Sequence, residues 1–397
     1  MEYKYDICVI GGGGHVGLPL AIAFADKGVK VSIYDINKDT IKIINKGKMP
    51  FLETGAEDIL RKVLNKTLYA YDNPEVISQS KFLVITVGTP VDEHLNPDFN
   101  VMNKFLKSNL KYFHDDQILI LRSTVFPGTT YKIKELLNAN GLKTGISFCP
   151  ERIAEGKAME ELYSLPQIIS GFKNETIEMV RELFLHITKD VIVITPLEAE
   201  LAKLFTNSWR YIQFAVANQF YMMAEYYGLD FYNIYNAMIY KYPRAKNFPR
   251  PGFAAGPCLF KDTMQLSAFN NNNFYLGHSA MLVNEGLPNY IVNRLKNKYE
   301  LSEKIVGILG MAFKSESDDI RESLSFKLKK ILEFETKQVL CSDEYVKRDE
   351  FIKKEELIAK SDIIIIGAPH KEYKDLKINN NKIVVDIWNL LGKGGLI

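Results

Sequence analysis

Short apolar runs recur along the first half of the chain and predict buried strands. They cover residues 5–10, 31–34, 82–87, 118–121 and 146–148, and stretches of helical periodicity separate them. Strands that alternate with helices form a parallel sheet with helices on both faces. The pattern therefore predicts a doubly wound α/β domain, which we place at residues 1–195.

The pattern changes after Thr195. Residues 196–240 contain few helix breakers and many aromatic side chains, so they predict a long helix. Packing between two domains or two subunits explains these aromatic side chains better than ligand binding does. We therefore expect a helical middle region over residues 196–300.

A third part, residues 301–397, resembles the first in outline. Strands are predicted at 305–309, 339–341, 363–366 and 383–385, and a helix at 323–334. Ser80–Ile85 before Gly88-Thr89-Pro90 is echoed by Ser361–Ile366 before Gly367-Ala368-Pro369. The sequence thus predicts two doubly wound α/β domains joined by a long central helix, with an active site between them.

A glycine-rich turn follows the first predicted strand and opens a helix. The motif is G-x-G-x-x-G, and its expected cofactor contacts are Gly12, Gly14, His15, Val16 and Gly17. Glycines let a pyrophosphate approach the backbone, and the helix N-terminus offers N–H groups to it. Asp35 ends the second strand about twenty residues further on, where a carboxylate can accept hydrogen bonds from both ribose hydroxyls. These features predict a Rossmann-like domain that binds NAD rather than NADP; a glycine turn kept for packing is the alternative.

Three further strands of this domain end in loops with polar or conformationally special residues. These loops are Gly88-Thr89-Pro90, Ser123-Thr124-Val125 and Cys149-Pro150-Glu151. Ligands of doubly wound sheets bind at the carboxyl ends of the strands. We therefore expect Gly88, Thr89, Pro90 and Thr124 to line the nicotinamide half of the cofactor site.

The overall composition excludes several classes of partner. The 397 residues contain 50 Lys and Arg against 48 Asp and Glu, a net charge of +2, which does not suggest a nucleic-acid-binding surface. No apolar run reaches the roughly 18–20 residues needed to cross a bilayer. The first residues are charged and lead directly into a strand, without the apolar region of a signal peptide. We expect a cytoplasmic protein with no membrane insertion.

Four cysteines are present, and their spacing argues against disulfides or a local zinc site, so no metal is predicted. Cys8, Cys149 and Cys341 lie in or beside apolar strands, where an inert buried thiol is expected. Cys258 differs because it follows Gly256-Pro257 at the expected entry to a helix. A helix N-terminus and the nearby Lys261 favour a thiolate, so Cys258 is the candidate nucleophile. A buried, inert cysteine is the alternative.

Several motifs in this order resemble the UDP-glucose/GDP-mannose dehydrogenase family of nucleotide-sugar 6-dehydrogenases, over essentially the whole chain. They are the glycine loop, Gly88-Thr89-Pro90, Ser123–Gly128, Pro150-Glu151 with Glu155-Gly156, Glu198–Lys203 with Asn207, Gly256–Asp262, and Gly310–Lys314 with Asp318–Ser323. The resemblance implies oxidation of a sugar C6 alcohol to a carboxylate with two NAD⁺, through a cysteine-bound thiohemiacetal and thioester.

The resemblance gives these residues roles that their chemistry supports. Lys203 and Asn207, four residues apart on a helix, can hold a developing alkoxide with a positive charge and an amide donor. Cys258 captures the aldehyde so that a second hydride can leave. Hydrolysis of the thioester needs an activated water. Its candidate bases are Asp262, Glu151 and Glu155, with Thr124 to position the water. A surface ion pair for Lys203, and capping for Glu151 and Thr124, are the alternatives.

The resemblance also implies contacts to the substrate and cofactor from the last part of the chain. It places Lys314 near the sugar nucleotide and Arg321 near the cofactor, and a diphosphate ligand suits both charges. Arg244 is the candidate to reach the substrate of a neighbouring subunit in a homodimer or higher homo-oligomer. The expected substrate contacts are Glu151, Lys203, Asn207, Arg244, Gly256, Cys258 and Lys314.

The sequence leaves alternatives for the sugar of the substrate and for the type of function. UDP-glucose and the UDP-N-acetylhexosamines are all candidate substrates; Glu151-Arg152-Ile153 and Pro97-Asp98 favour an N-acetylated sugar, and GDP-mannose is disfavoured. The alternative functions are a two-electron dehydrogenase of the 6-phosphogluconate or 3-hydroxyacyl type and a non-catalytic NAD-binding protein. A non-catalytic protein has no need of the nucleophile Cys258, and the two-electron enzymes lack such a cysteine.

Overall fold

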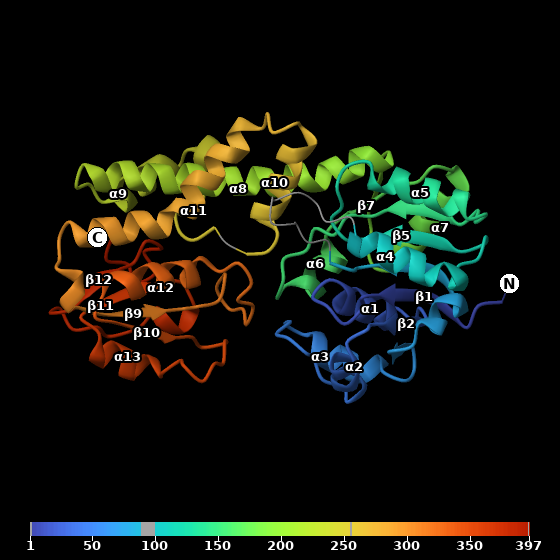
Figure 1. Ribbon diagram of the computed structural model, residues 1–397, viewed down its shortest axis with the longest axis horizontal. Helices are drawn as coiled ribbons and strands as arrows, with labels where there is room; N and C mark the ends of the chain where they lie inside the picture. Colours follow the sequence, from blue (N-terminus) through green and yellow to red (C-terminus); the bar gives the residue numbers. More distant parts are fainter. Residues whose placement is uncertain (1, 89–99, 255, 396) are drawn as a thin grey trace. The chain divides into compact units, whose positions relative to one another are not determined.

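A computed structural model shows how the chain folds (Figure 1) and describes residues 2–88, 100–254, 256–395 and 397. Thr89, Pro90 and the Pro97-Asp98 pair lie outside the described residues. The chain divides into two compact units, Met1–Thr206 and Asn207–Ile397. The predicted middle region, 196–300, contributes residues to both units, and its boundaries as a separate domain stay a prediction.

Unit 1 is built around a six-stranded sheet. Its strands and helices are β1 (Tyr5–Ile10), α1 (Gly17–Asp26), β2 (Val31–Tyr34), α2 (Lys38–Asn45), α3 (Ala56–Val63), β3 (Leu68–Tyr71), η1 (Pro74–Gln79), β4 (Ser80–Ile85), α4 (Asn100–Asn109), η2 (Leu110–Tyr112), β5 (Ile118–Leu121), α5 (Thr129–Ala139), β6 (Gly145–Phe148), α6 (Ala158–Ser164), β7 (Gln167–Ile169), α7 (Asn174–Phe184) and β8 (Val191–Val193). The sheet has the order β3-β2-β1-β4-β5-β6 with all strands parallel, and β7 pairs with β8 separately. This order is typical of a dinucleotide-binding domain.

Alternate residues of each strand face opposite layers of this unit. In β1, Ile7 and Val9 pack with helices α1, α3, α6 and α7, whereas Cys8 and Ile10 pack with α4 and α5. Both faces of the sheet are therefore covered, which explains why its strands are almost entirely apolar. The predicted doubly wound domain is confirmed.

The long helix α8 (Pro196–Tyr226) runs from unit 1 into unit 2. It starts in a capping box: Glu198 accepts hydrogen bonds from the backbone N–H and the hydroxyl of Thr195, at 2.8 and 2.7 Å. The prediction of one helix over 196–240 is wrong, because α8 ends at Tyr226 and α9 (Phe231–Ile239) follows. Gly228 has φ +69° and Asp230 caps α9 through the N–H of Tyr232, so the chain turns between the two helices.

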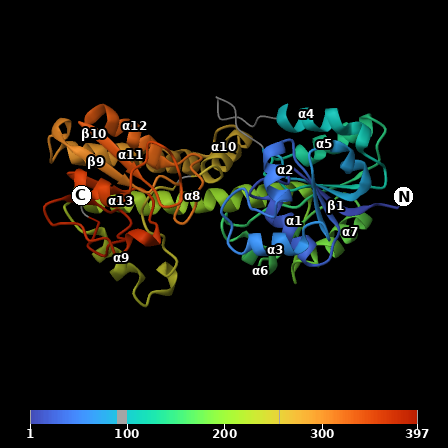
Figure 2. The same cartoon turned by 90° about the horizontal axis from the view of Figure 1, so that it is seen from below.

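Unit 2 contains a second, smaller parallel sheet. Its elements after α9 are η3 (Pro243–Ala245), α10 (Leu259–Phe269), α11 (Tyr275–Lys296), η4 (Leu301–Glu303), β9 (Ile305–Leu309), α12 (Leu324–Glu335), β10 (Gln338–Ser342), α13 (Lys354–Lys360), β11 (Ile363–Ile366), η5 (Lys371–Tyr373) and β12 (Ile383–Val385). The sheet order is β10-β9-β11-β12, all parallel. Helices α11 and α12 cover one face and α13 the other (Figure 2). The second predicted α/β domain is confirmed.

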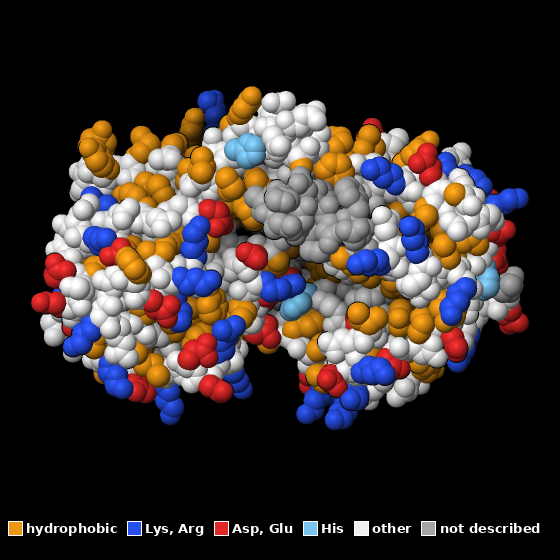
Figure 3. All heavy atoms as spheres, in the orientation of Figure 1, with side chains coloured by type: hydrophobic (Ala, Val, Ile, Leu, Met, Phe, Trp, Pro, Cys, Tyr) orange, Lys and Arg blue, Asp and Glu red, His pale blue; other side chains and the backbone are white. Residues whose placement is uncertain are grey.

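The surface carries no dominant charge on the face drawn in Figure 3, where basic and acidic side chains are interspersed on each unit. Among the described helices, none combines the length and the apolar character needed to cross a membrane.

Candidate active site

The glycine loop between β1 and α1 is closely packed around two of its glycines. A Cβ on Gly12 would lie 2.7 Å from the carbonyl oxygen of Val9, and one on Gly17 would lie 2.6 Å from Oγ1 of Thr86. Both positions therefore accept only glycine. Gly14 is exposed, and a Cβ there would meet nothing closer than 3.7 Å.

The same loop fits the diphosphate and ribose of NAD. Helix α1 begins at Gly17 without a side-chain cap from Val16, and a helix N-terminus suits a pyrophosphate, although the N–H of Leu18 already donates to the carbonyl oxygen of Gly14 and Pro19 has no N–H. Asp35 follows β2, is partly exposed, and accepts the N–H of Gly13 through Oδ2 at 2.9 Å. An acidic side chain at this place disfavours the additional phosphate of NADP.

The strand-end loops of unit 1 carry the other predicted cofactor contacts. Gly88 is exposed beyond β4 and Thr124 is partly buried beyond β5. Ser123 ties the two loops together by donating from Oγ to the carbonyl oxygen of Val87 at 2.6 Å.

Thr86 is a residue that the sequence did not reveal. Its hydroxyl donates to the carbonyl oxygens of Ile10 and Gly11 and so joins the end of β4 to the glycine loop.

Glu151 is held by a buried ion pair. Its Oε2 accepts from Nε and Nη2 of Arg122 at 3.0 and 2.6 Å, and Arg122 is completely buried. Oε1 accepts the backbone N–H groups of Arg152 and Ile153 at 2.7 and 3.0 Å. Both carboxylate oxygens are thus engaged, which suits an orienting role better than water activation. The sequence did not lead us to Arg122. The signal that could have revealed it is its position, since it is a basic residue directly after the apolar strand β5. Glu155 lies partly buried on the following loop.

Glu200 joins the start of α8 to the loop that carries Thr124. Its Oε2 accepts the N–H of Gly128 at 2.6 Å, and its Oε1 accepts the N–H and hydroxyl of Thr130 at 2.8 and 2.6 Å. Burial is the main effect on this carboxyl, and it raises the pKa of Glu200 against these hydrogen bonds. Lys203 lies one turn further along α8 and is partly buried. Glu200 therefore places Lys203 relative to the Thr124 loop.

Cys258, Asp262 and Asn207 come together in unit 2. Cys258 is the exposed residue at the N-cap of α10, and no side chain caps that helix. Asp262 follows one turn later, is 1% exposed, and its Oδ2 accepts from Nδ2 of Asn207 at 2.6 Å. Oδ1 of Asp262 is buried without a hydrogen bond, and Nζ of Lys261 lies 3.7 Å from it. A thiol at the positive end of a helix, with a partly satisfied carboxylate one turn behind it, suits covalent chemistry.

The loop before Cys258 is fixed by residues that the sequence did not reveal. Asn218 of α8 accepts the N–H of Gly252 and donates to its carbonyl oxygen, at 2.8 and 3.0 Å, and it also donates to Asn284 of α11. Gly256 has φ +104°, and a Cβ there would lie 2.6 Å from the ring of Phe313. The predicted substrate contact Gly256 thus has a conformational reason to be glycine.

The three predicted basic contacts lie on separate segments of unit 2. Nζ of Lys314 is 5.5 Å from the ring centroid of Phe313. Arg321 has a half-exposed side chain that binds the carboxylate of Asp319, with Nη2 2.5 Å from Oδ2. Arg244 is exposed in η3, where Nη1 lies 3.4 Å from the hydroxyl of Tyr242.

The other three cysteines are core residues, as predicted. Burial raises the pKa of Cys8 and Cys341 to about 12 and that of Cys149 to about 11. These thiols stay protonated and unreactive at neutral pH.

The parallel sheet order of unit 1, its glycine loop and Asp35 define an NAD-binding domain of the Rossmann class. Sequence models of the UDP-glucose/GDP-mannose dehydrogenase family match three regions: the NAD binding domain at residues 5–188, the central domain at 197–285 and the UDP binding domain at 307–393. The chain belongs to this family, and it is an NAD-dependent nucleotide-sugar dehydrogenase. The predicted family, fold class and cofactor are confirmed.

Individual relatives agree with this assignment. The chain is 31% identical to a UDP-N-acetyl-D-mannosamine dehydrogenase of Pyrococcus horikoshii, over 96% of this chain and 94% of the relative. It is 30% identical to an enzyme of the same name from Methanocaldococcus jannaschii, over 98% and 93%. The solved structure of the UDP-D-ManNAc dehydrogenase from Pyrococcus horikoshii superposes with a TM-score of 0.87 at 30% identity, covering 94% of this chain and 91% of that one.

Proposed function

We propose that the chain oxidises the C6 hydroxyl of UDP-N-acetyl-D-mannosamine to the carboxylate and reduces two NAD⁺. Relatives with this printed activity match the chain over nearly its whole length at 30–31% identity. The observation that carries the four-electron chemistry is the exposed Cys258 at the N-terminus of α10, one turn from the buried Asn207–Asp262 pair. The two-electron and the non-catalytic alternatives offer no use for this cysteine.

In the first step the alcohol loses a proton and a hydride and becomes an aldehyde. NAD supplies the hydride acceptor. Lys203 provides a positive charge for the developing alkoxide, and Asn207 lies one turn away on the same helix. The amide of Asn207 carries two N–H bonds, and Asp262 uses one of them, so the other can serve the substrate.

In the second step Sγ of Cys258 adds to the aldehyde carbon and forms a thiohemiacetal. That carbon then loses a second hydride, for which a second NAD⁺ would be the acceptor, and its hydroxyl loses a proton, which gives the thioester. Water then attacks the thioester carbon, the C–S bond breaks, and the thiol recovers its proton. The aldehyde stays bound to the enzyme throughout.

Between Asp262 and Glu151, the contacts favour Asp262 for activating this water. Its Oδ1 is buried without a hydrogen bond, whereas both oxygens of Glu151 are occupied. We assign Glu151 an orienting role through Arg122, and Thr124 the positioning of water. Glu155 remains a second candidate base.

The nucleotide part of the substrate binds to unit 2 in this proposal. Its UDP binding domain carries Lys314 and Arg321, whose charges suit a diphosphate and the cofactor, respectively. Gly256 shapes the loop beneath the sugar, and Arg244 serves the substrate of a neighbouring subunit.

The proposed homo-oligomer is supported by exposed apolar side chains on α8. Phe205, Trp209 and Met223 are 55%, 60% and 53% exposed, and Tyr226 is 74% exposed. Such a row is unusual on a free surface. Light scattering of the purified chain tests the oligomeric state; a monomer would refute it. A cytoplasmic location stays a prediction from the sequence.

The reaction is tested by counting NADH released per sugar nucleotide. The panel contains UDP-N-acetyl-D-mannosamine, UDP-N-acetylglucosamine, UDP-N-acetylgalactosamine and UDP-glucose. We expect two NADH per UDP-N-acetyl-D-mannosamine, and loss of the acid product with Cys258→Ser. One NADH per sugar together with an active Cys258→Ser enzyme would contradict the mechanism, and preference for another sugar would contradict the substrate.

A further inference from the structure

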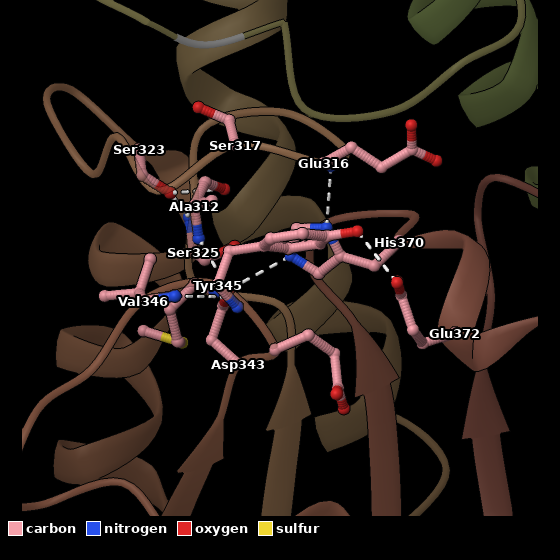
Figure 4. Close-up of polar contacts among 12 residues, drawn as sticks. Ala312, Glu316, Ser317, Ser323, Ser325, Asp343, Tyr345, Val346, His370 and Glu372 are labelled. Carbon is pink, nitrogen blue, oxygen red and sulfur yellow. Dashed lines mark hydrogen bonds and ion pairs between the residues drawn. The ribbon is translucent and has the colours of Figure 1, made fainter. Parts of the chain in front are cut away.

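Three loops meet at the carboxyl edge of the small sheet, and two buried side chains hold them together (Figure 4). The loops follow β9, β10 and β11, and they contain Lys314, Asp343 and His370, respectively. Ligands of parallel sheets bind at this edge. It is therefore the edge at which the UDP binding domain is expected to receive its nucleotide.

Asp343 accepts four backbone N–H groups. Its Oδ2 accepts from Met311 and Ala312 at 2.6 and 3.0 Å, and its Oδ1 accepts from Tyr345 and Val346 at 2.8 and 2.9 Å. The side chain is completely buried. Asp343 thus attaches the start of the loop after β9 to the loop after β10.

His370 holds the other end of the same loop. Its Nδ1 accepts the backbone N–H of Glu316 at 2.9 Å, and its Nε2 lies 3.1 Å from Oδ2 of Asp343. Because Nδ1 accepts, the hydrogen of the neutral ring is on Nε2 and is donated to Asp343. The rings of Tyr345 and Tyr373 pack against the imidazole, with centroids 4.9 and 5.4 Å away.

Residues 311–316, here called the Lys314 segment, are therefore fixed at both ends. Glu316 has φ +54°, a left-handed conformation that a non-glycine residue adopts only when its surroundings hold it. Lys314 lies in the middle of the segment, three residues after Met311 and two before Glu316.

The loop after β9 differs from the glycine loop of unit 1 in how many of its N–H groups an aspartate occupies. After β2, the partly exposed Asp35 accepts one N–H of the glycine loop, from Gly13. At the corresponding place after β10, the buried Asp343 accepts two, from Met311 and Ala312. These two N–H groups of the second loop are no longer available to phosphate oxygens. A diphosphate at this edge therefore relies more on side-chain charge than one at the glycine loop, and the Lys314 segment carries such a charge.

We propose that His370 and Asp343 are positioning residues for a nucleoside diphosphate, and that they act by holding the Lys314 segment in its binding conformation. The proposal rests on the nucleotide-binding role given to Lys314 under the proposed function. Preorganisation of this kind lowers the ordering cost of binding.

UDP itself is the probe, measured by calorimetric titration of the full chain, so that no turnover is needed. His370→Gln keeps a donor towards Asp343 but removes the acceptor for Glu316, whereas His370→Asn keeps an acceptor near the Nδ1 position. We expect His370→Gln to weaken UDP binding about tenfold and His370→Asn to weaken it less than about threefold, with NAD binding unchanged in both. Equal affinities in the two variants would overturn the proposal.

A double-mutant cycle separates positioning from general destabilisation. If His370 acts through Lys314, His370→Gln has little further effect on UDP binding in a Lys314→Ala background. Additive losses would refute this link. Ile364→Val, a core change in the neighbouring strand β11, is the matched control and should leave UDP binding unchanged at a reduced melting temperature.

Hydrogen exchange on the wild-type chain tests the clamp without any substitution. The amide of Glu316 should exchange slowly before UDP is added, because His370 already accepts its hydrogen bond. Fast exchange that slows only with UDP would overturn the proposal. If the wild type binds UDP but oxidises no sugar nucleotide, the proposed function fails while these measurements still decide the role of His370.

Discussion

Asn207 donates from Nδ2 to Oδ2 of Asp262 across 2.6 Å, and the two side chains are 5% and 1% exposed. The pair joins α8 to α10, one turn after Cys258. An amide beside a buried carboxylate compensates part of the cost of burying that charge. The polarity of Asn207 is therefore needed for the fold as well as for the proposed reaction.

Replacement of Asn207 by Asp places two carboxyl groups within hydrogen-bond distance in a buried site. We expect the free energy of unfolding near neutral pH to fall by about 2–4 kcal/mol. The loss should shrink as the pH is lowered, because two such carboxyls come to share a proton. Urea unfolding at several pH values measures both effects.

Asn236→Asp on the exposed side of α9 is the matched control. It should change stability little and without this dependence on pH. If the Asn207→Asp chain were as stable as the wild type near neutral pH, the contact with Asp262 would not have the energetic weight that we give it.

Glu200 makes the stability of unit 1 depend on pH in a definite direction. Burial raises the pKa of Glu200 above its ordinary value of 4.5, so ionisation costs more in the folded than in the unfolded chain. A raised pKa gives stability that is present below the unfolded value and is lost as the pH rises through the folded value. The stability of the wild type relative to Glu200→Gln should therefore decrease as the pH rises above about 4.5.

Glu198 on the same helix is the matched control for this measurement. Hydrogen bonds from the side chain and backbone of Thr195 lower the pKa of the exposed Glu198. The wild type should therefore gain stability relative to Glu198→Gln as the pH rises. Urea unfolding at several pH values gives the free energy of unfolding of each variant. If it depended on pH in the same way in both variants, the direction argued for Glu200 would be wrong.

The elements and contacts that the sequence predicted are those whose residues lie close together in the chain. The strand, glycine loop and helix around Gly12 are adjacent in the chain, and Cys258 and Asp262 are one helical turn apart. The division of residues 196–240 into two helices was missed because aromatic side chains continue across Gly228. A single glycine in a helical pattern did not outweigh that signal.

The supporting contacts could not be predicted because their partners lie far apart in the chain. Arg122 binds Glu151 at a separation of 29 residues, and Asn218 binds Gly252 at a separation of 34. A polar residue in a sequence shows that it needs a partner when buried, but not which partner the fold supplies.

Gly256→Ala tests the conformation of the loop before Cys258. The variant combines a strained φ of +104° with a Cβ that would lie 2.6 Å from Phe313. We expect a loss of about 2–4 kcal/mol in the free energy of unfolding and a larger relative loss of turnover, since the loop leads into Cys258.

Gly228→Ala separates these two causes. Gly228 has φ +69°, but a Cβ there would meet nothing within 4 Å, so this variant carries strain without a clash. Its cost should be about 1 kcal/mol, with turnover retained. Similar losses in the two variants, measured by thermal unfolding and NADH release, would argue against a role for the contact with Phe313.

Asp35→Ser tests the preference for NAD over NADP. The carboxylate lies at the carboxyl end of β2, where it would repel the additional phosphate of NADP and accept hydrogen bonds from the ribose hydroxyls of NAD. We expect the ratio of kcat/KM for NADP to that for NAD to rise at least about tenfold, mainly through KM.

Asp39→Ser is the control for a general effect of lost charge. Asp39 is an exposed acidic residue in the first turn of α2, and its replacement should leave the ratio unchanged. An unchanged ratio in Asp35→Ser, from initial rates with each cofactor, would show that another residue determines the choice.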